Sequence, residues 1–484
     1  MATLISGTVK GGEVGTAAAH NAVDCLGAAT KDNDSHGRQG GYQFPHFMRI
    51  CYLPINSIFF FDDLRRDRVT KFIKFGNRKF NGMNVSKLLT IFISLILVSC
   101  SPEGLKTAKP EKMDMDPAGF VLVDSIMNKS IADGNTSGAV VAVVRKDRLV
   151  FLKAYGNKQT VPEVEPMTTG TMFDMASCSK CISTTLSIMQ LIEKGRIRLH
   201  DYVDEYIPGF KPWVGESTRR ITVEHLLTHT SGLPASVDAE LVCGRYGENC
   251  PDSLIKYIAT ETSRNFEPGT DFIYSCVNFN ALQGIIQNVT GSRLCDYAQK
   301  NIFDALGLRH TMYLPLDREI PEEVLALVAP TEVQENGLPL RGQVHDPTAR
   351  LCNWGNSGNA GVFSTAEDCA VIAAALMNGG EINGHRILSP LTVELMTTVP
   401  DDIAPGVGRA LGWDLRSDYS RMKGDITSRH RTICHTGYTG PSIVIDMENQ
   451  LAIIIMANRC HPYDEGSLNR TRATVANVVA SMCR

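Results

Sequence analysis

Apolar residues alternate with polar ones at both ends of the longer part of the chain, which predicts β-hairpins there. Residues 137–156 contain two runs rich in β-branched side chains, and the polar pair Lys146-Asp147 separates them. Residues 441–458 repeat this pattern with two apolar runs around a polar turn. Such runs joined by a short polar turn are typical of paired strands.

Between the hairpins the apolar residues recur with helical spacing. In residues 182–192 they recur in steps of three and four, and Gly195 supplies a stop signal. Residues 222–232 and 278–291 also have helical patterns ending in Gly, and residues 470–483 have helical spacing. We therefore expect an α/β (α+β) fold in which both chain ends form one sheet and an all-α lobe is inserted between them. A cleft between the two lobes is the expected ligand site.

The segment that follows Met83 resembles the signal peptide of a bacterial lipoprotein. Lys87 gives it a positive start, and residues 88–98 form an apolar run too short to span a membrane. The run ends in Leu-Val-Ser-Cys, a lipobox with Cys100 as the acylated residue. The alternative, a buried core helix, would rarely end in that tetrapeptide. The expected organisation is an upstream extension (1–82), a signal peptide (83–100), a polar tether (101–116) and a hydrolase domain (117–484).

Composition and charge are ordinary for a globular protein. Hydrophobic residues make up 43% of the chain and charged residues 21%, with a net charge of −4. The basic residues among the first 82 are scattered and form no phosphate-binding stripe. We therefore expect no nucleic-acid partner. The lipoprotein interpretation predicts a protein anchored through lipid to a membrane of a bacterial cell envelope, facing the periplasm or the exterior. We also expect a monomer.

Cysteine spacing does not describe a disulfide framework. Eleven of the 14 cysteines follow Cys100, and an odd number cannot pair completely. Cys243 and Cys250 could close a short loop. Cys178 and Cys181 form a C-x-x-C pair, which would suggest a redox couple or half of a metal site.

The same stretch contains a second motif, S-x-x-K, formed by Ser177 and Lys180. A serine at the start of a helix has unpaired backbone N–H groups beside it, and these could bind a developing oxyanion. Lys180 lies on the same helix face, within reach of the serine hydroxyl. A lysine whose pKa is lowered by partial burial could accept the hydroxyl proton. The motif is common by chance and needs support from elsewhere.

Two further motifs follow in a fixed order. "FEPGTDFIYSCVNF" contains Tyr274-Ser275, and "RTICHTGYTGPSIVID" contains His435-Thr436-Gly437 at the start of a strand. With these motifs, residues 120–480 resemble the serine β-lactamase superfamily, in the branch of class C β-lactamases, penicillin-binding D-alanyl peptidases and esterases. Flanking segments such as "ITVEHLLTHTSGLP" are similar to this family as well. The resemblance implies a β-lactamase/transpeptidase-like fold with an antiparallel sheet flanked by helices.

The resemblance also implies a role for each motif residue. Ser177 is the acylated nucleophile, Lys180 activates it, and Tyr274 passes the proton to the leaving group. The N–H groups of Ser177 and Tyr438 form the oxyanion hole. The substrate-binding site is lined by His435, Thr436, Gly437, Tyr438 and Cys276. No metal or cofactor is implied, and the substrate is a small molecule or a cell-wall peptide.

Two departures from the family pattern affect the expected activity. Cys276 stands where class C β-lactamases carry Asn. His435 replaces the lysine of K-T-G, and we expect it to be only partly charged near neutral pH. Both changes favour a D-alanyl peptidase or an esterase over an efficient β-lactamase. The alternative is a catalytically weak lipoprotein that binds or senses cell-wall peptides or β-lactams.

Other candidate sites receive less support from the sequence. A redox role for Cys178 and Cys181 would need a thioredoxin-like setting or a second ligand pair. His225 and His229 are four residues apart and could hold a metal, although the Glu of a zincin follows the first His rather than preceding it. Ser357 lacks the G-x-S-x-G nucleophile elbow of an α/β-hydrolase.

Overall fold

The computed structural model describes residues 104–211 and 219–484. The chain divides into two units, residues 1–82 and 83–484, and all described residues belong to the second. The predicted upstream extension, the signal peptide and the lipidated Cys100 lie outside the described residues. These expectations therefore stay predictions.

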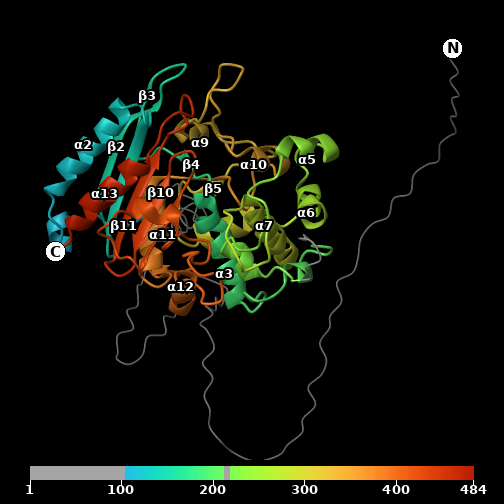
Figure 1. Ribbon diagram of the computed structural model, residues 1–484. Coiled ribbons are helices and arrows are strands. Elements are labelled where there is room, and N and C mark those ends of the chain that lie inside the picture. Colours follow the sequence, from blue (N-terminus) through green and yellow to red (C-terminus); the bar gives the residue numbers. More distant parts are fainter. Residues whose placement is uncertain (1–103, 212–218) are drawn as a thin grey trace, which may run out of the picture. The chain divides into compact units, whose positions relative to one another are not determined.

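One six-stranded antiparallel sheet forms the centre of the described unit (Figure 1), with the strand order β3-β2-β1-β11-β10-β9. The first hairpin is β1–β2 and the second is β10–β11, as the alternating pattern predicts. β1 pairs with β11 and brings the two hairpins together, with Val141 opposite Ile455. The strands are β1 Gly138–Arg145, β2 Arg148–Gln159, β3 Glu165–Pro166, β9 Thr432–Thr436, β10 Ser442–Asp446 and β11 Leu451–Ala457.

Helices cover both faces of this sheet. Helices α2 (Gly119–Ala132) and α13 (Asn469–Ser481) pack on one face, and α11 (Ala366–Met377) packs on the other (Figure 1). Alternate residues of β1 accordingly enter two different apolar clusters, Val141 on one side and Val140 on the other. A strand buried on both faces reads as a continuous apolar run, and "AVVAVV" is such a run.

The middle of the chain forms the helical lobe and two small sheets, β4-β6-β5 and β7-β8. This distribution confirms the expected fold class. The helices are η1 Pro110–Met113, η2 Lys180–Thr185, α3 Leu186–Glu193, η3 Val203–Glu205, α4 Val223–Leu227, α5 Ala239–Tyr246, α6 Pro251–Thr260, α7 Cys276–Thr290, α8 Leu294–Ala298, η4 Gln299–Phe303, α9 Glu322–Leu327, α10 Pro347–Cys352, α12 Pro390–Met396 and η5 Asp418–Lys423. The short strands are β4 Phe173–Asp174, β5 Met312–Tyr313, β6 Val362–Ser364, β7 Glu381–Ile382 and β8 His385–Arg386. Among the described residues, no helix has the length and apolar character to cross a membrane.

The predicted tether over residues 101–116 is wrong for its described part, residues 104–116. This segment packs against the domain, with Leu105 and Met115 buried. Its backbone is also paired, since the Asp116 N–H donates to the Met482 carbonyl at 2.8 Å. The segment is mostly polar in composition, so its two buried apolar residues, Leu105 and Met115, gave no sequence signal.

Truncation of Met115 should therefore destabilise the protein. The side chain is 1% exposed, so Met115→Ala removes buried apolar volume and is expected to lower the free energy of unfolding by about 2–5 kcal/mol. Met113→Ala, at a partly exposed position in the same segment, serves as the control and should cost much less. Urea unfolding of both variants measures the difference, and equal small effects would mean that the segment is a loose tether after all.

Candidate active site

Ser177 lies in a tight turn between β4 and the helical segment that continues into α3. The Cys178 N–H donates to the Met175 carbonyl at 2.9 Å, and the Lys180 N–H donates to the Ser177 carbonyl at 3.1 Å. Ala176 has φ of 42°, in the left-handed region that residues with a Cβ rarely adopt. Such backbone strain is found at functional sites. The predicted position of Ser177 at a helix start is confirmed.

Lys180 is fully buried and reaches back to the serine. Its Nζ lies 3.0 Å from Ser177 Oγ, 2.9 Å from the Asn359 carbonyl oxygen and 3.5 Å from Cys276 Sγ. It begins η2, a π-helical turn, a form that occurs often at functional sites. Burial alone lowers the pKa of Lys180, but negative charge on Cys276 or Tyr274 raises it above its ordinary value, so the expected net lowering is wrong.

Tyr274 joins this pair from the loop before α7. Lys180 Nζ lies 5.3 Å from the centre of its ring, and the side chain of Ser177 favours the ionised form of its hydroxyl. Burial raises the pKa of Tyr274 to about 12, although the neighbouring Lys180 acts in the opposite direction. The ring stacks on His229 at 4.6 Å between centroids, and His229 Nδ1 accepts the Ser275 N–H at 2.9 Å. The tyrosine is thus fixed on two sides.

A buried polar cluster supports Lys180 from behind. Ser357 Oγ lies 2.8 Å from Asn280 Nδ2 and donates to Asn359 Oδ1 at 2.7 Å. Asn359 in turn offers its backbone carbonyl to Lys180. Ser357 is therefore a structural residue within this cluster, which agrees with its lack of a nucleophile elbow.

His435 occupies the end of β9 beside Tyr274, with 6.0 Å between the ring centroids. The side chain is 2% exposed. Its Nδ1–H donates to the Thr436 carbonyl at 2.9 Å, which leaves Nε2 unprotonated in the neutral ring. Burial lowers the pKa of His435 to about 4, and Asp414 opposes this shift only in part. The expectation of a partly charged histidine near neutral pH is wrong, because burial keeps the ring neutral there.

Gly437 brings the end of β9 against the nucleophile turn. A Cβ added to Gly437 would lie 2.5 Å from the Met175 carbonyl oxygen. The N–H groups of Ser177 and Tyr438 lie on these two adjacent segments, and neither donates to an acceptor within the part of the chain that the structure describes. Two free donors on neighbouring segments are what an oxyanion hole requires. Thr436 is half-buried and Tyr438 exposed.

An ion pair next to the site was missed by the sequence analysis. Arg409 and Asp414 form a buried pair, and the Arg409 guanidinium lies 5.7 Å from the centre of the Tyr274 ring. Both charges also act on His435. The sequence does not predict this pair, because only the tertiary fold brings Arg409 and Asp414 close to Tyr274.

The thiols of the nucleophile turn do not form a redox pair. Cys178 and Cys181 are fully buried, and their Sγ atoms face different carbonyl groups, those of His435 and Gly412. Burial raises the pKa of both thiols above the ordinary value. An inert thiol is the expected result of such burial. This arrangement removes the C-x-x-C alternative.

The possible Cys243–Cys250 disulfide is not formed. Every cysteine among the described residues is free, and Cys243 Sγ instead lies 3.5 Å from Cys352 Sγ. The reason is the packing of α5 against α10, which brings together two cysteines far apart in the sequence.

The two histidines that follow Glu224 serve the local structure rather than a shared metal site. His225 Nδ1 accepts the Thr222 N–H at 3.1 Å and caps the start of α4. His229 is buried under Tyr274, and its Nδ1 is already used by Ser275. The two rings therefore have separate partners.

Comparisons with known proteins agree with this geometry. Residues 123–477 match the family model described as Beta-lactamase. A protein of Salmonella paratyphi B named "Putative D-alanyl-D-alanine carboxypeptidase" is 30% identical over 403 residues, which cover 78% of this chain and 92% of that protein.

Solved structures with the same fold include two hydrolases. EstCE1, a hydrolase with promiscuous acyltransferase activity, is 23% identical with a TM-score of 0.61 and covers 75% of this chain and 98% of its own. A beta-lactamase/D-alanine carboxypeptidase from Pseudomonas syringae is 21% identical with a TM-score of 0.57, covering 76% and 99%. The fold, the family model and the sequence relative agree, and the chain belongs to the beta-lactamase family of serine hydrolases.

Proposed function

We propose that the protein hydrolyses acyl donors through a covalent acyl-enzyme on Ser177. The observation that carries this proposal is the 3.0 Å contact between Lys180 Nζ and Ser177 Oγ. A serine hydroxyl becomes an effective nucleophile when an adjacent base can take its proton. The free N–H groups of Ser177 and Tyr438 are the donors for the oxyanion.

The proton route runs through Lys180 and Tyr274. Lys180 Nζ lies 3.0 Å from Ser177 Oγ and 5.3 Å from the centre of the Tyr274 ring, and both neighbours favour the ionised form of Tyr274. A proton leaving Ser177 Oγ passes to the unprotonated member of this pair and then to the departing group as the acyl–Ser177 bond forms. Water repeats the sequence in deacylation, with Ser177 as the leaving group. Arg409 and His229 hold the tyrosine ring in place for both steps.

The proposed acyl donor is a D-alanyl peptide. The carboxypeptidase names of relatives about 30% identical to this chain support this choice. A second candidate is a small uncharged ester, and the neutral His435 favours it. The third motif supplies no charge for a substrate carboxylate, and Arg409 is already paired with Asp414.

Intact-mass analysis tests both candidates. The protein is incubated with a penicillin, a cephalosporin, a D-alanyl-D-alanine peptide and a nitrophenyl ester, and free D-alanine is measured in parallel. We expect a transient adduct of one acyl group and catalytic release of D-alanine or nitrophenol. A permanent β-lactam adduct without turnover of peptide or ester would support the binding or sensing alternative. No adduct and no turnover with any donor would overturn the proposal.

The neutral state of His435 predicts a flat pH response. Its pKa of about 4 keeps the ring uncharged above that pH, so no charge is lost between pH 6 and 8. We expect the ratio of KM for a carboxylate-bearing substrate to KM for an uncharged ester to stay constant across this range. Steady-state kinetics on both substrates measure the ratio. A steady rise with pH would show instead that His435 titrates near neutrality and attracts the carboxylate.

We also propose that the protein is a monomeric lipoprotein of the cell envelope. The support is the lipobox ending at Cys100 after an apolar run of signal-peptide length. A chain expressed from Met83 should incorporate labelled palmitate and partition into membranes, and Cys100→Ala should abolish both. An unlabelled, soluble wild-type product would contradict the proposal.

A further inference from the structure

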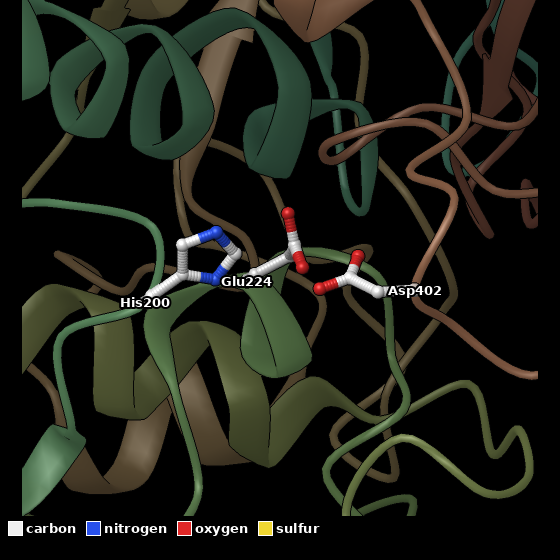
Figure 2. A group of neighbouring side chains, drawn as sticks. All are labelled: His200, Glu224 and Asp402. Carbon is white, nitrogen blue, oxygen red and sulfur yellow. The ribbon is translucent and has the colours of Figure 1, made fainter.

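Three potential metal ligands meet beside the first turn of α4. His200, Glu224 and Asp402 each place one ligand atom within 4.8 Å of the others, and their side chains point toward one another (Figure 2). They come from the loop after α3, from α4 and from the loop after α12. Their sequence spacing gives no hint of this meeting.

Backbone hydrogen bonds fix the first two ligands side by side. The Glu224 N–H donates to the Leu199 carbonyl at 2.9 Å, and the Val223 N–H donates to the Asp201 carbonyl at 3.1 Å. The residues on both sides of His200 are thus tied to the first turn of α4. A site held by rigid main chain loses little entropy when it binds an ion.

The carboxylates lack a counter-charge. Glu224 is 5% exposed, and among the described residues neither a backbone nor a side-chain N–H donates to its carboxylate, and no Lys or Arg forms an ion pair with it or with Asp402. A buried carboxylate facing a second one is costly unless a cation or a proton lies between them.

We propose that His200, Glu224 and Asp402 bind one divalent metal ion of the zinc type. An imidazole with two carboxylates suits zinc and its neighbours in the first transition row better than calcium or magnesium, which take only oxygen ligands. Two ligands of one zinc ion are at most about 4.4 Å apart, because each bond is about 2.0–2.2 Å long. The exposed side chains of His200 and Asp402 reach this range by small rotations. The solvent side leaves room for a water ligand.

The ion would join two segments that flank the candidate active site. α4 leads within five residues of Glu224 to His229, which stacks on Tyr274. The loop from Asp402 leads to Arg409, whose guanidinium faces the same ring. The Gly412 N–H already donates to the Leu227 carbonyl at 2.9 Å. The metal therefore stabilises the support of Tyr274 and takes no part in acyl transfer. This site departs from the sequence-based expectation that no metal is involved.

The test uses tag-free protein stripped with a chelator and titrated with ZnCl₂ alone, by calorimetry and by metal analysis after equilibrium dialysis. We expect one zinc ion per chain, and saturation at 100 times Kd should raise Tm by about 3–6 °C. Glu224→Gln and Asp402→Asn should each weaken binding at least about tenfold. Asp401→Asn, the exposed neighbour outside the cluster, is the matched control and should bind as the wild type does.

Asp402→Asn and His200→Ala change exposed residues, so they keep the test valid if Glu224→Gln fails to fold. Binding that survives in both variants would place the zinc elsewhere in the chain and overturn the proposal. Wild-type protein that binds no zinc at 100 μM, roughly a thousandfold above the Kd that corresponds to about 10 kcal/mol, would overturn it as well. In that case a proton shared between Glu224 and Asp402 accounts for their contact.

Discussion

Replacing Ser177 with alanine is expected to abolish covalent labelling by a penicillin or a fluorophosphonate and to lower kcat/KM by roughly 10⁴-fold or more. The substitution removes the hydroxyl that lies 3.0 Å from Lys180 Nζ and attacks the acyl carbon in the proposed reaction. The remaining N–H donors can still polarise a carbonyl, so a small residual rate over water is expected. Intact mass and steady-state kinetics on the same preparation measure the two effects.

The matched control is the double variant Cys178→Ala with Cys181→Ala. Both thiols are fully buried and face carbonyl groups away from the hydroxyl of Ser177. Labelling should persist, with a loss of stability on the order of 1 kcal/mol per cysteine from the removal of small buried groups. If the double variant is inactive while Ser177→Ala still reacts, the chemistry belongs to the thiols and the proposed function is wrong.

The sheet was predictable because its strands obey local rules. "AVVAVV" and "LAIIIMA" are β-branched runs next to short polar turns, and such runs pair as hairpins wherever both faces are covered. Each hairpin has an edge strand with unpaired backbone groups, and the pairing of β1 with β11 satisfies these groups in both hairpins. The segment 104–116 escaped prediction because two isolated apolar residues, Leu105 and Met115, produce no periodic pattern.

Only those residues of the candidate site that belong to short sequence motifs could be predicted. Ser177 and Lys180 are one helical turn apart, so their contact follows from the spacing. The charge of His435 does not, because it depends on burial by residues far along the chain and on Asp414. A histidine read from sequence carries its ordinary pKa, whereas burial in the folded protein lowers the pKa of His435 to about 4 and favours the neutral ring. The Arg409–Asp414 pair and the cluster around Glu224 depend on tertiary contacts in the same way.

Gly437→Ala should impair the proposed oxyanion hole and leave Ser177, Lys180 and Tyr274 intact. The added Cβ would meet the Met175 carbonyl oxygen at 2.5 Å, a distance that forces the backbone of one segment to move. Because the Tyr438 N–H follows Gly437 directly, it would shift relative to the Ser177 N–H. Loss of one well-placed oxyanion donor costs about 10²–10³ in kcat, and we expect a fall of that size.

Gly170→Ala is the matched control, since a Cβ there meets nothing within 4 Å. It should leave kcat unchanged and alter the free energy of unfolding by less than about 1 kcal/mol in the stabilising direction. The decisive comparison is kcat against labelling stoichiometry in Gly437→Ala, because Ser177, Lys180 and Tyr274 stay in place. Slow but complete acylation supports the assignment of the Tyr438 N–H to the oxyanion hole. A folded Gly437→Ala variant with wild-type kcat would show that the end of β9 takes no part in stabilising the transition state.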